Sequence, residues 1–406
     1  MTTTTVTQAV ARPHLVAHTV EIEPPADRAD LLDHLGPDGV AWFADDVSFV
    51  TSGAAASVAP DRVASLLATI DREGDSPHPA AGPMAAGALP FDGAGLLVVP
   101  GTSVGCTKDG RAWKTTIAPD DGSAQPPRTP ERALCVPSRF SVESRPDSRA
   151  WKRQVLAALD LIGRGALEKV VLAREVYVEA DRDFDRAAVL SLLLRTQPGC
   201  TVYAHGSFVG ATPELLVARS GADIVSRPMA GSIPAGFDAD DAAVRGLLAS
   251  AKEGREHAIL VEAVRDGLSP FATRVSVGPP EAVRLPSVTH LATTVAATLR
   301  DPATTALDLA VALHPTPAVG GAPRSAAVDA IRGIESFERG RYGGPVGWVS
   351  ADGDGEFAVA LRCALIEGSC AYLYAGAGIV AGSDPDAEWA ETQAKLEPMM
   401  RVLVRP

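Results

Sequence analysis

The last part of the chain carries two carboxylates and an amine at spacings that place them on one side of a helix. Glu388 and Glu391 are three residues apart, and Lys395 follows four residues after Glu391. Residues at these spacings share a helix face. Residues 376–378 (GAG) before them predict a glycine loop that could approach an anion, and 383–385 (SDP) are typical of a helix start. The stripe indicates a site for a metal and an anionic ligand, or else an ordinary solvated helix face.

A second segment carries the same pair of carboxylates. Residues 244–266 have apolar residues at helical spacing, and on this predicted helix Glu253 and Glu256 are three apart, followed by His257. Two helices that each present a Glu-x-x-Glu pair across a cleft could form a cage of oxygen ligands. Oxygen-only ligation suits Mg²⁺, which shares its coordination shell with water and anionic substrates. No Cys and His grouping has the spacing of a zinc site.

Composition limits the classes of protein that remain. A formal net charge of −13 argues against nucleic acid or an acidic membrane as partner, and no run approaches a membrane span. The N-terminal segment lacks the apolar core of a signal peptide. We therefore expect a cytoplasmic protein whose five scattered cysteines are reduced thiols: Cys106, Cys135, Cys200, Cys363 and Cys370.

The elements that must position these residues are clearest after residue 150. A predicted helix at 151–162 precedes a β-branched strand that begins at Lys169, and Glu214 lies in a turn between strands at 201–208 and 215–219. Lys169 could act as a base if desolvation or nearby cations lowered its pKa, and Glu214 could act as an acid if burial raised its pKa. Both residues could instead have no catalytic role: Lys169 would then be a solvated lysine, and Glu214 a carboxylate in a turn.

The order of predicted elements gives a fold class. Further strands are expected at 224–229, 287–294, 348–349, 357–365 and 371–375, with a helix at 325–334. The front part has short strands within 40–50 and 85–100 and a helix near 61–72, while 107–149 is predicted to be a long surface connection. Strand clusters separated by helices favour an α/β fold with two mainly antiparallel sheets packed together and flanked by helices. We expect one domain over 1–406, with a variable part at 1–149 and a catalytic part at 150–405.

Nine ordered motifs resemble the chorismate-utilising enzymes. They are EKVVLAR, GATPELL, RPMAGS, SAKEGREH, THLATT, LHPTPAVGGAP, GPVGW, ALRCA and GAGIVAGSDPDAEWAETQAKL, and they span roughly residues 150–405. The front part resembles the family only loosely. The resemblance implies a single α/β domain with two large antiparallel sheets, and chorismate as the substrate.

The resemblance also implies roles for particular residues. Lys169 matches the base that activates water for attack at C2, and Glu214 matches the acid that assists loss of the C4 hydroxyl. Glu256 and Glu391 match Mg²⁺ ligands, with Glu253 and Glu388 close by. The positions that match the substrate-binding pocket are Gly231, Ser232, His290, Ala318, Arg362, Gly376 and Lys395. His290 could equally have a structural role.

A few positions discriminate among members of the family. Members that add ammonia carry Gln where Lys169 stands, and aminodeoxychorismate-forming enzymes often carry Lys where Ala230 stands. Ala318 and Ser232 favour an isochorismate synthase. Tyr342 and Leu361 look more like salicylate-forming members, which go on to eliminate pyruvate. The salicylate-forming reaction is therefore the alternative.

The expected partner is the small molecule alone. The chain includes no glutamine amidotransferase domain, so we expect no obligatory amidotransferase subunit, and a monomer. The product could enter siderophore or menaquinone synthesis. A non-catalytic relative that binds an anion is a further alternative, but a binder needs no acid and base, and both are present here.

Overall fold

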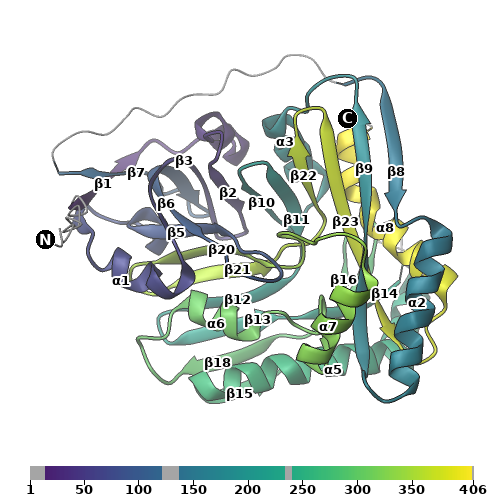
Figure 1. Ribbon diagram of the computed structural model, residues 1–406. Coiled ribbons are helices and arrows are strands. Elements are labelled where there is room, and N and C mark those ends of the chain that lie inside the picture. Colours follow the sequence, from purple (N-terminus) through teal and green to yellow (C-terminus); the bar gives the residue numbers. More distant parts are fainter. Residues whose placement is uncertain (1–13, 121–136, 234–239, 405–406) are drawn as a thin grey trace, which may run out of the picture.

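The computed structural model describes residues 14–120, 137–233 and 240–404 (Figure 1). The expectations for the N-terminal segment before residue 14 and for Cys135 fall outside these residues. Within them the strands pair in two long rows, a small third sheet lies beside the rows, and helices cover their outer faces.

The first row contains the longest strands of the molecule. Near one end of this row β9 pairs with β23, and each residue from Lys169 to Glu179 has a partner on the antiparallel strand. β-Branched residues suit such a half-buried pleated surface. The row runs through β8 (Phe140–Arg145), β9 (Lys169–Ala180), β23 (Cys370–Val380), β22 (Cys363–Glu367), β11 (Phe208–Thr212), β10 (Thr201–His205), β2 (Val40–Phe43), β3 (Val47–Val58), β6 (Leu97–Thr107), β7 (Ala112–Pro119), β1 (Leu15–Ile22) and β4 (Asp71–Glu73).

The second row crosses below the first in Figure 1, where the upright β9 and β23 stand beside it. It runs through β15 (Ala272–Val277), β18 (Val295–Leu299), β13 (Asp223–Arg227), β12 (Leu215–Ser220), β21 (Gly355–Val359), β20 (Pro345–Ser350) and β5 (Met84–Ala88). The pair Ala86 and Val98 joins β5 to β6 and so connects the two rows. The expected pair of large, mainly antiparallel sheets is confirmed, with this one bridge between them.

Apolar side chains fill the space between the rows. Phe49 from the first row meets Trp348 from the second edge to face, with ring centroids 6.2 Å apart. Trp42 and Trp113, both from the front part of the chain, are completely buried in the same cluster. Aromatic side chains bury more area than other residues, so the front part contributes strongly to the shared core.

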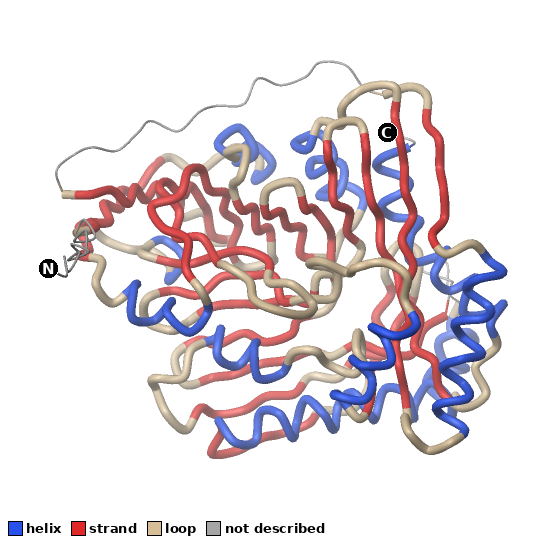
Figure 2. The backbone as a smooth tube through the Cα atoms, in the orientation of Figure 1, coloured by secondary structure: helices blue, strands red, loops and turns tan. Residues whose placement is uncertain are grey.

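The small sheet and the helices complete the fold, as Figure 2 shows in red and blue. The small sheet has β14 (Met229–Ile233) paired with β17 (Thr289–Ala292), which pairs with β16 (Glu281–Arg284), and the short β19 (Gly321–Ala322) pairs with β9. The helices are α1 (Val63–Leu67), α2 (Ser148–Gly163), α3 (Arg186–Thr196), α4 (Asp241–Ala249), α5 (Ala251–Leu268), α6 (Ala306–Leu313), α7 (Arg324–Ile334) and α8 (Pro385–Val404).

Helix α8 is held at its first turn by two different contacts. Asp384 accepts hydrogen bonds from the backbone of Asp386 and Ala387 at 3.1 and 2.9 Å, so its carboxylate caps the helix. The indole of Trp151 in α2 donates to the carbonyl of Pro385 at 3.2 Å. The predicted helix start at 383–385 is therefore confirmed.

Several predicted elements have different boundaries in the structure. The helix expected at 244–266 is two helices, because Ser250 is extended (φ −70, ψ 117) and its side chain caps α5. The predicted strand 201–208 divides into β10 and β11 around Gly206, and the helix near 61–72 shrinks to α1. The surface connection expected at 107–149 contains β7 and β8, because Trp113 and its neighbours pair with β1 and β6.

The prediction of a glycine loop at 376–378 was also wrong. These residues lie inside β23 and pair with Val171 to Ala173 of β9. The absent side chains leave room beside the sheet, as described below.

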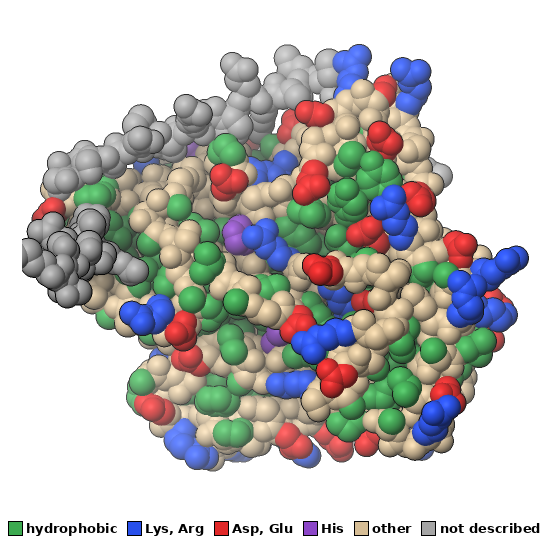
Figure 3. Space-filling view, in the orientation of Figure 1, with side chains coloured by type: hydrophobic (Ala, Val, Ile, Leu, Met, Phe, Trp, Pro, Cys, Tyr) green, Lys and Arg blue, Asp and Glu red, His purple; other side chains and the backbone are tan. Residues whose placement is uncertain are grey.

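None of the described helices is long and apolar enough to cross a membrane. Four cysteines lie in the described part of the chain and are free thiols: Cys106, Cys200, Cys363 and Cys370. On the face in Figure 3, basic and acidic side chains are interspersed.

Candidate functional site

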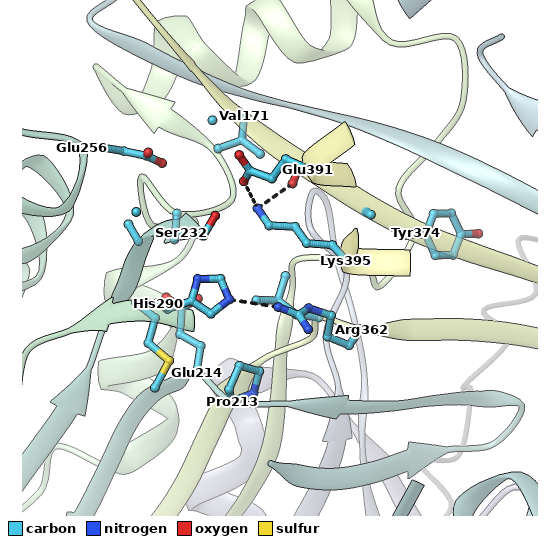
Figure 4. A pocket seen from close by; sticks show the side chains of 18 of the residues that line it. Val171, Pro213, Glu214, Ser232, Glu256, His290, Arg362, Tyr374, Glu391 and Lys395 are labelled. Carbon is cyan, nitrogen blue, oxygen red and sulfur yellow. Dashed lines mark hydrogen bonds and ion pairs between the residues drawn. The ribbon is translucent and has the colours of Figure 1, made fainter. Parts of the chain in front are cut away.

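One pocket brings most of the predicted site residues together (Figure 4). It lies where β9 and β23 meet the small sheet, α5 and α8. Ten of the predicted residues line it: Glu214, Gly231, Ser232, Glu256, His290, Ala318, Arg362, Gly376, Glu391 and Lys395. Lys169, Glu253 and Glu388 lie outside this lining, and the contacts that place them follow below.

Glu214 is the acidic group of the pocket floor. The turn between β11 and β12 buries its side chain, which is 3% exposed. Burial raises the pKa of Glu214 to about 8, although a backbone hydrogen bond from Met229 and the ammonium groups of Lys169 and Lys395 oppose the shift. Near neutral pH this carboxyl is protonated and can donate a proton.

Arg362 and His290 form a polar wall beside Glu214. The guanidinium donates to Nε2 of His290 at 3.0 Å, so that nitrogen is the acceptor. Burial, Arg362 and Lys395 all hold the pKa of His290 far below its usual value, which makes the ring neutral. Arg362 has φ +47, the left-handed region that bulky residues rarely adopt, and backbone of this kind is often held at functional sites. The wall offers a fixed cation to an anionic ligand.

The small sheet supplies a close backbone approach. Gly231 has φ +74 and lies at a register shift between β14 and β17. A Cβ there would be 3.2 Å from the Cβ of Glu253. Both the positive φ and this close contact therefore favour glycine. The next residue, Ser232, donates its backbone N–H to Glu253 at 3.1 Å. Burial and the Glu256 carboxylate raise the pKa of Glu253, although the hydrogen bond from Ser232 acts to lower it.

Helix α8 contributes a carboxylate and an amine to the opposite wall. The Lys395 ammonium lies 2.5 Å from Glu391 and donates to the carbonyl of Gly376 at 3.0 Å. The predicted spacing of Glu391 and Lys395 on one helix face is therefore confirmed. Arg362 and Lys395 bring two cations into one pocket, which Glu256 and Glu391 also line, in a chain that is acidic as a whole.

Lys169 stands behind the pocket rather than in its lining. Its ammonium, 1% exposed, lies 2.8 Å from Oε1 of Glu256, which does line the pocket. Burial opposes ionisation of Glu256, but Lys169, Lys395 and Lys252 together hold its pKa below the usual value. Lys169, the predicted base, therefore lies next to the pocket and contacts it through Glu256.

The remaining carboxylate, Glu388, is buried and incompletely satisfied. Its Oε1 has no hydrogen-bond partner among the described residues, and the Lys252 ammonium is 3.6 Å away. Burial and the nearby Glu391 raise the pKa of Glu388 to about 6. Among the described residues, no three acidic, His or Cys side chains are close enough to form a ready metal cage.

The donor set nevertheless fits a hard divalent cation in its chemistry. Glu253 and Glu256 come from α5, Glu388 and Glu391 from α8, and the pKa of Glu253 and of Glu388 is raised in part by other members of this set. The orphaned oxygen of Glu388 is a free acceptor. In the structure, lysine side chains balance the negative charges of these carboxylates, and a bound divalent metal ion could do the same.

Some lining residues were not predicted as site residues. The sequence indicated Tyr342 and Leu361 only as family discriminators and Gly378 only as part of the predicted glycine loop, and it did not indicate Tyr374. Tyr342 and Tyr374 stack with centroids 5.5 Å apart and close one side of the pocket. The period-two alternation of β23 places Tyr374, Gly376 and Gly378 on one face, and this signal could have found them.

Comparison with known proteins identifies similar chains. Residues 114–404 match the family model described as chorismate binding enzyme. The chain is 36% identical over 358 residues to isochorismate synthase DhbC of Bacillus subtilis, which covers 84% of this chain and 85% of that protein.

Two solved structures share the fold over nearly the whole chain. A putative 2,3-dihydroxybenzoate-specific isochorismate synthase, DhbC from Bacillus anthracis, superposes with a TM-score of 0.79 at 31% identity, covering 93% of this chain and 99% of that one. The menaquinone-specific isochorismate synthase MenF from Escherichia coli gives 0.82 at 26% identity, covering 98% and 97%. These relatives agree with the isochorismate synthase reading and not with the salicylate-forming alternative.

Proposed function

The chain belongs to the chorismate-binding enzyme family, and from this premise we propose that it is an isochorismate synthase. In this reaction a hydroxyl adds at C2 of chorismate, the ring double bonds shift, and the C4 hydroxyl leaves. Water is consumed at one carbon and released at the other, so the net change is an isomerisation.

The observation that carries the proposal is the protonated carboxyl of Glu214 in a pocket that Arg362 and Lys395 also line. With a pKa of about 8, Glu214 keeps its proton at neutral pH and can transfer it to a leaving hydroxyl. Arg362 and Lys395 line the same pocket and suit the two carboxylates of chorismate, since a planar guanidinium binds carboxylate in two-point contact. An anion binder would need the cations but not the acid.

Lys169 is the proposed base for the attacking water. Its Nζ is buried and lies 2.8 Å from Oε1 of Glu256, which lines the pocket, so Lys169 stands next to the space in which the water would be activated. Gly376 and Gly231 line the pocket at points where neighbouring protein atoms leave little space for a Cβ.

We propose Mg²⁺ as the cofactor, held by Glu256 and Glu391 with Glu253 and Glu388 directly or through water. Mg²⁺ would neutralise the ring carboxylate of the substrate and balance the charge of Glu256. The support is the set of four carboxylates from two helices and the unsatisfied oxygen of Glu388.

The proposal is tested with purified protein, chorismate and MgCl₂. Chromatography should show a mixture of chorismate and isochorismate, and a lactate-dehydrogenase-coupled assay should show little pyruvate. The Glu214→Gln variant serves as the matched control, because it keeps the shape of the pocket and removes the acid. Unchanged chorismate, or pyruvate and salicylate in stoichiometric amounts, would overturn the assignment.

Relatives named for menaquinone and for the siderophore vibriobactin both match this chain. The chemistry of the pocket is common to both uses. We further propose that the enzyme acts as a monomer without an amidotransferase subunit, which size-exclusion chromatography with light scattering would test against a dimer.

A further inference from the structure

Arg174 lies completely buried in the middle of β9, three residues beyond Val171, the residue of this strand that lines the pocket. Because side chains alternate along a strand, Val171 faces the pocket and Arg174 points to the opposite side, toward α8. Its Nε donates to the hydroxyl of Thr392 at 2.8 Å, and its Nη1 donates to the hydroxyl of Ser144 in β8 at 2.7 Å. The guanidinium lies 3.8 Å from the ring centroid of Trp389.

This cation is costly for the fold to bury. Nη2 has no hydrogen-bond partner, and no carboxylate among the described residues pairs with the guanidinium. Burial lowers the pKa of Arg174 to about 10, so the group stays charged at neutral pH. An apolar side chain of similar volume at such a position is often as stable or more stable. A contribution to stability alone therefore does not explain an arginine here.

The contacts of Arg174 are interleaved with the site residues of α8. Trp389 follows Glu388 directly, and Thr392 follows Glu391 directly. Successive helix residues are separated by about 100° around the axis, so the side that contacts Arg174 fixes where Glu388, Glu391 and Lys395 point. Trp389 also meets Trp151 of α2 with ring centroids 6.3 Å apart, and Thr392 donates back to the carbonyl of Trp389 at 2.7 Å.

We propose that Arg174 is a positioning residue, which sets the rotation of α8 about its axis and thereby orients the carboxylates that face the pocket. The inference rests on the proposed function for the role of those carboxylates. Its distinctive feature is directionality, because two donors and one planar face of the guanidinium engage β8 and two successive turns of α8. An arginine can make these contacts together, whereas lysine offers a point charge and methionine only bulk.

Arg219 in β12 provides a matched control. It is also buried, also has one guanidinium nitrogen without a partner, and donates to the carbonyls of Gly221 and Pro302. It does not line the pocket. Replacing either arginine removes a buried guanidinium, and Arg219→Met also removes the ion-pair partner 3.8 Å from Asp354, so the unfolding free energy of both variants is measured alongside.

The experiment compares Arg174→Met, Arg174→Lys and Arg219→Met at a temperature where circular dichroism shows each folded. Calorimetric titration with MgCl₂ alone should show about 10-fold weaker binding for Arg174→Met, the size expected for residues that orient metal ligands. The KM for chorismate should rise in parallel. Arg174→Lys should fall between the wild type and Arg174→Met, and Arg219→Met should stay within twofold of the wild type. Equal Mg²⁺ affinity and KM in Arg174→Met and Arg219→Met would overturn the proposal.

Hydrogen exchange of the amides in 385–404 gives a readout that needs neither metal nor substrate. Faster exchange in Arg174→Met than in Arg219→Met supports positioning of α8, and equal exchange contradicts it. If the wild type fails to convert chorismate, that result counts against the proposed function. The hydrogen-exchange measurement still decides whether Arg174 positions α8. If Arg174→Met does not fold, Thr392→Val removes the acceptor on α8 with little change in shape, and wild-type exchange and Mg²⁺ affinity in it would overturn the proposal.

Discussion

The ammonium of Lys169 and the carboxylate of Glu256 form a buried ion pair 2.8 Å long at the back of the pocket. The two residues come from β9 and α5 and are 87 positions apart in the chain. One is the proposed base and the other a proposed metal ligand. Their pairing means that a change at either residue alters the surroundings of the other, so the proposed base and the proposed ligand are coupled.

Lys169→Ala should abolish measurable isomerisation, because water without a positioned base is a poor nucleophile. Positioned bases contribute about 10²–10⁴-fold, so kcat at saturating chorismate should fall by that factor. The variant should also lose about 3–5 kcal/mol of unfolding free energy, because Glu256 is left as an uncompensated buried charge.

A double variant separates the two effects. Lys169→Met combined with Glu256→Gln removes both charges, so urea denaturation should show stability closer to the wild type than Lys169→Ala has. Its kcat should stay as low as that of the single variant. Recovery of activity in the double variant would show that Lys169 acts only by neutralising Glu256.

Glu214 gives the reaction a pH dependence. Since burial raises its pKa to about 8, the fraction of protonated acid falls above that pH, and kcat should decline on the alkaline side. Glu214→Gln should bind chorismate, lack the alkaline decline, and show a kcat about 10²–10⁴-fold lower. A wild-type profile that stays flat from pH 7 to pH 10 would contradict the role of Glu214 as the acid.

The same shift makes a prediction for stability. In the folded state the pKa of Glu214 is about 8, above its ordinary value of 4.5. Between these two pH values Glu214 therefore holds a proton in the folded state that it has lost in the unfolded state. The favourable contribution is present below pH 4.5 and disappears as pH rises toward 8. The Tm of the wild type minus that of Glu214→Gln should therefore become smaller from pH 5 to pH 8.

Removal of the metal tests the carboxylates of α8. EDTA should abolish turnover of the wild type and excess MgCl₂ should restore it, while Glu391→Ala should need at least about 10-fold more Mg²⁺. Glu397→Ala is the matched control, because this residue lies on the same helix, pairs with Arg401 and is half exposed. Mg²⁺ affinity should also weaken below pH 6, where Glu388 takes up a proton. Full turnover in excess chelator would contradict the metal assignment.

Much of the site was predictable from local spacing. The i,i+3 and i,i+4 rules placed Glu391 and Lys395 on one side of α8, and β-branched alternation placed Lys169 at the start of β9. What depends on tertiary packing was not predictable. The pairing of Lys169 with Glu256, the approach of Lys252 to Glu388 and the burial that raises the pKa of Glu214 all require elements distant in sequence.

Errors in the predicted elements have the same origin. Ser250 has reasonable helix propensity, and its extended backbone follows from packing α4 and α5 as separate elements. Residues 376–378 look like a loop because two of the three are glycine, yet all three pair with residues of β9. Glycine in a strand marks a close approach as often as a turn, and here the approach is the pocket itself.

Gly378 is the glycine on which the Lys169–Glu256 pair most directly depends. A Cβ at this position would be 2.6 Å from Oε1 of Glu256 and 2.9 Å from Cε of Lys169, which is closer than real Cβ contacts come. Gly378→Ala must therefore displace one member of the pair. A misplacement of about 1 Å in a catalytic group can cost about 10²-fold in rate, and we expect kcat to fall by this order. Gly246→Ala is the control, since a Cβ in that turn of α4 meets nothing within 4 Å and the change should add about 1 kcal/mol of helix stability. Chromatographic assay of both variants, each checked by thermal unfolding, gives the answer: wild-type kcat in Gly378→Ala would mean that the exact placement of the Lys169–Glu256 pair does not control the reaction.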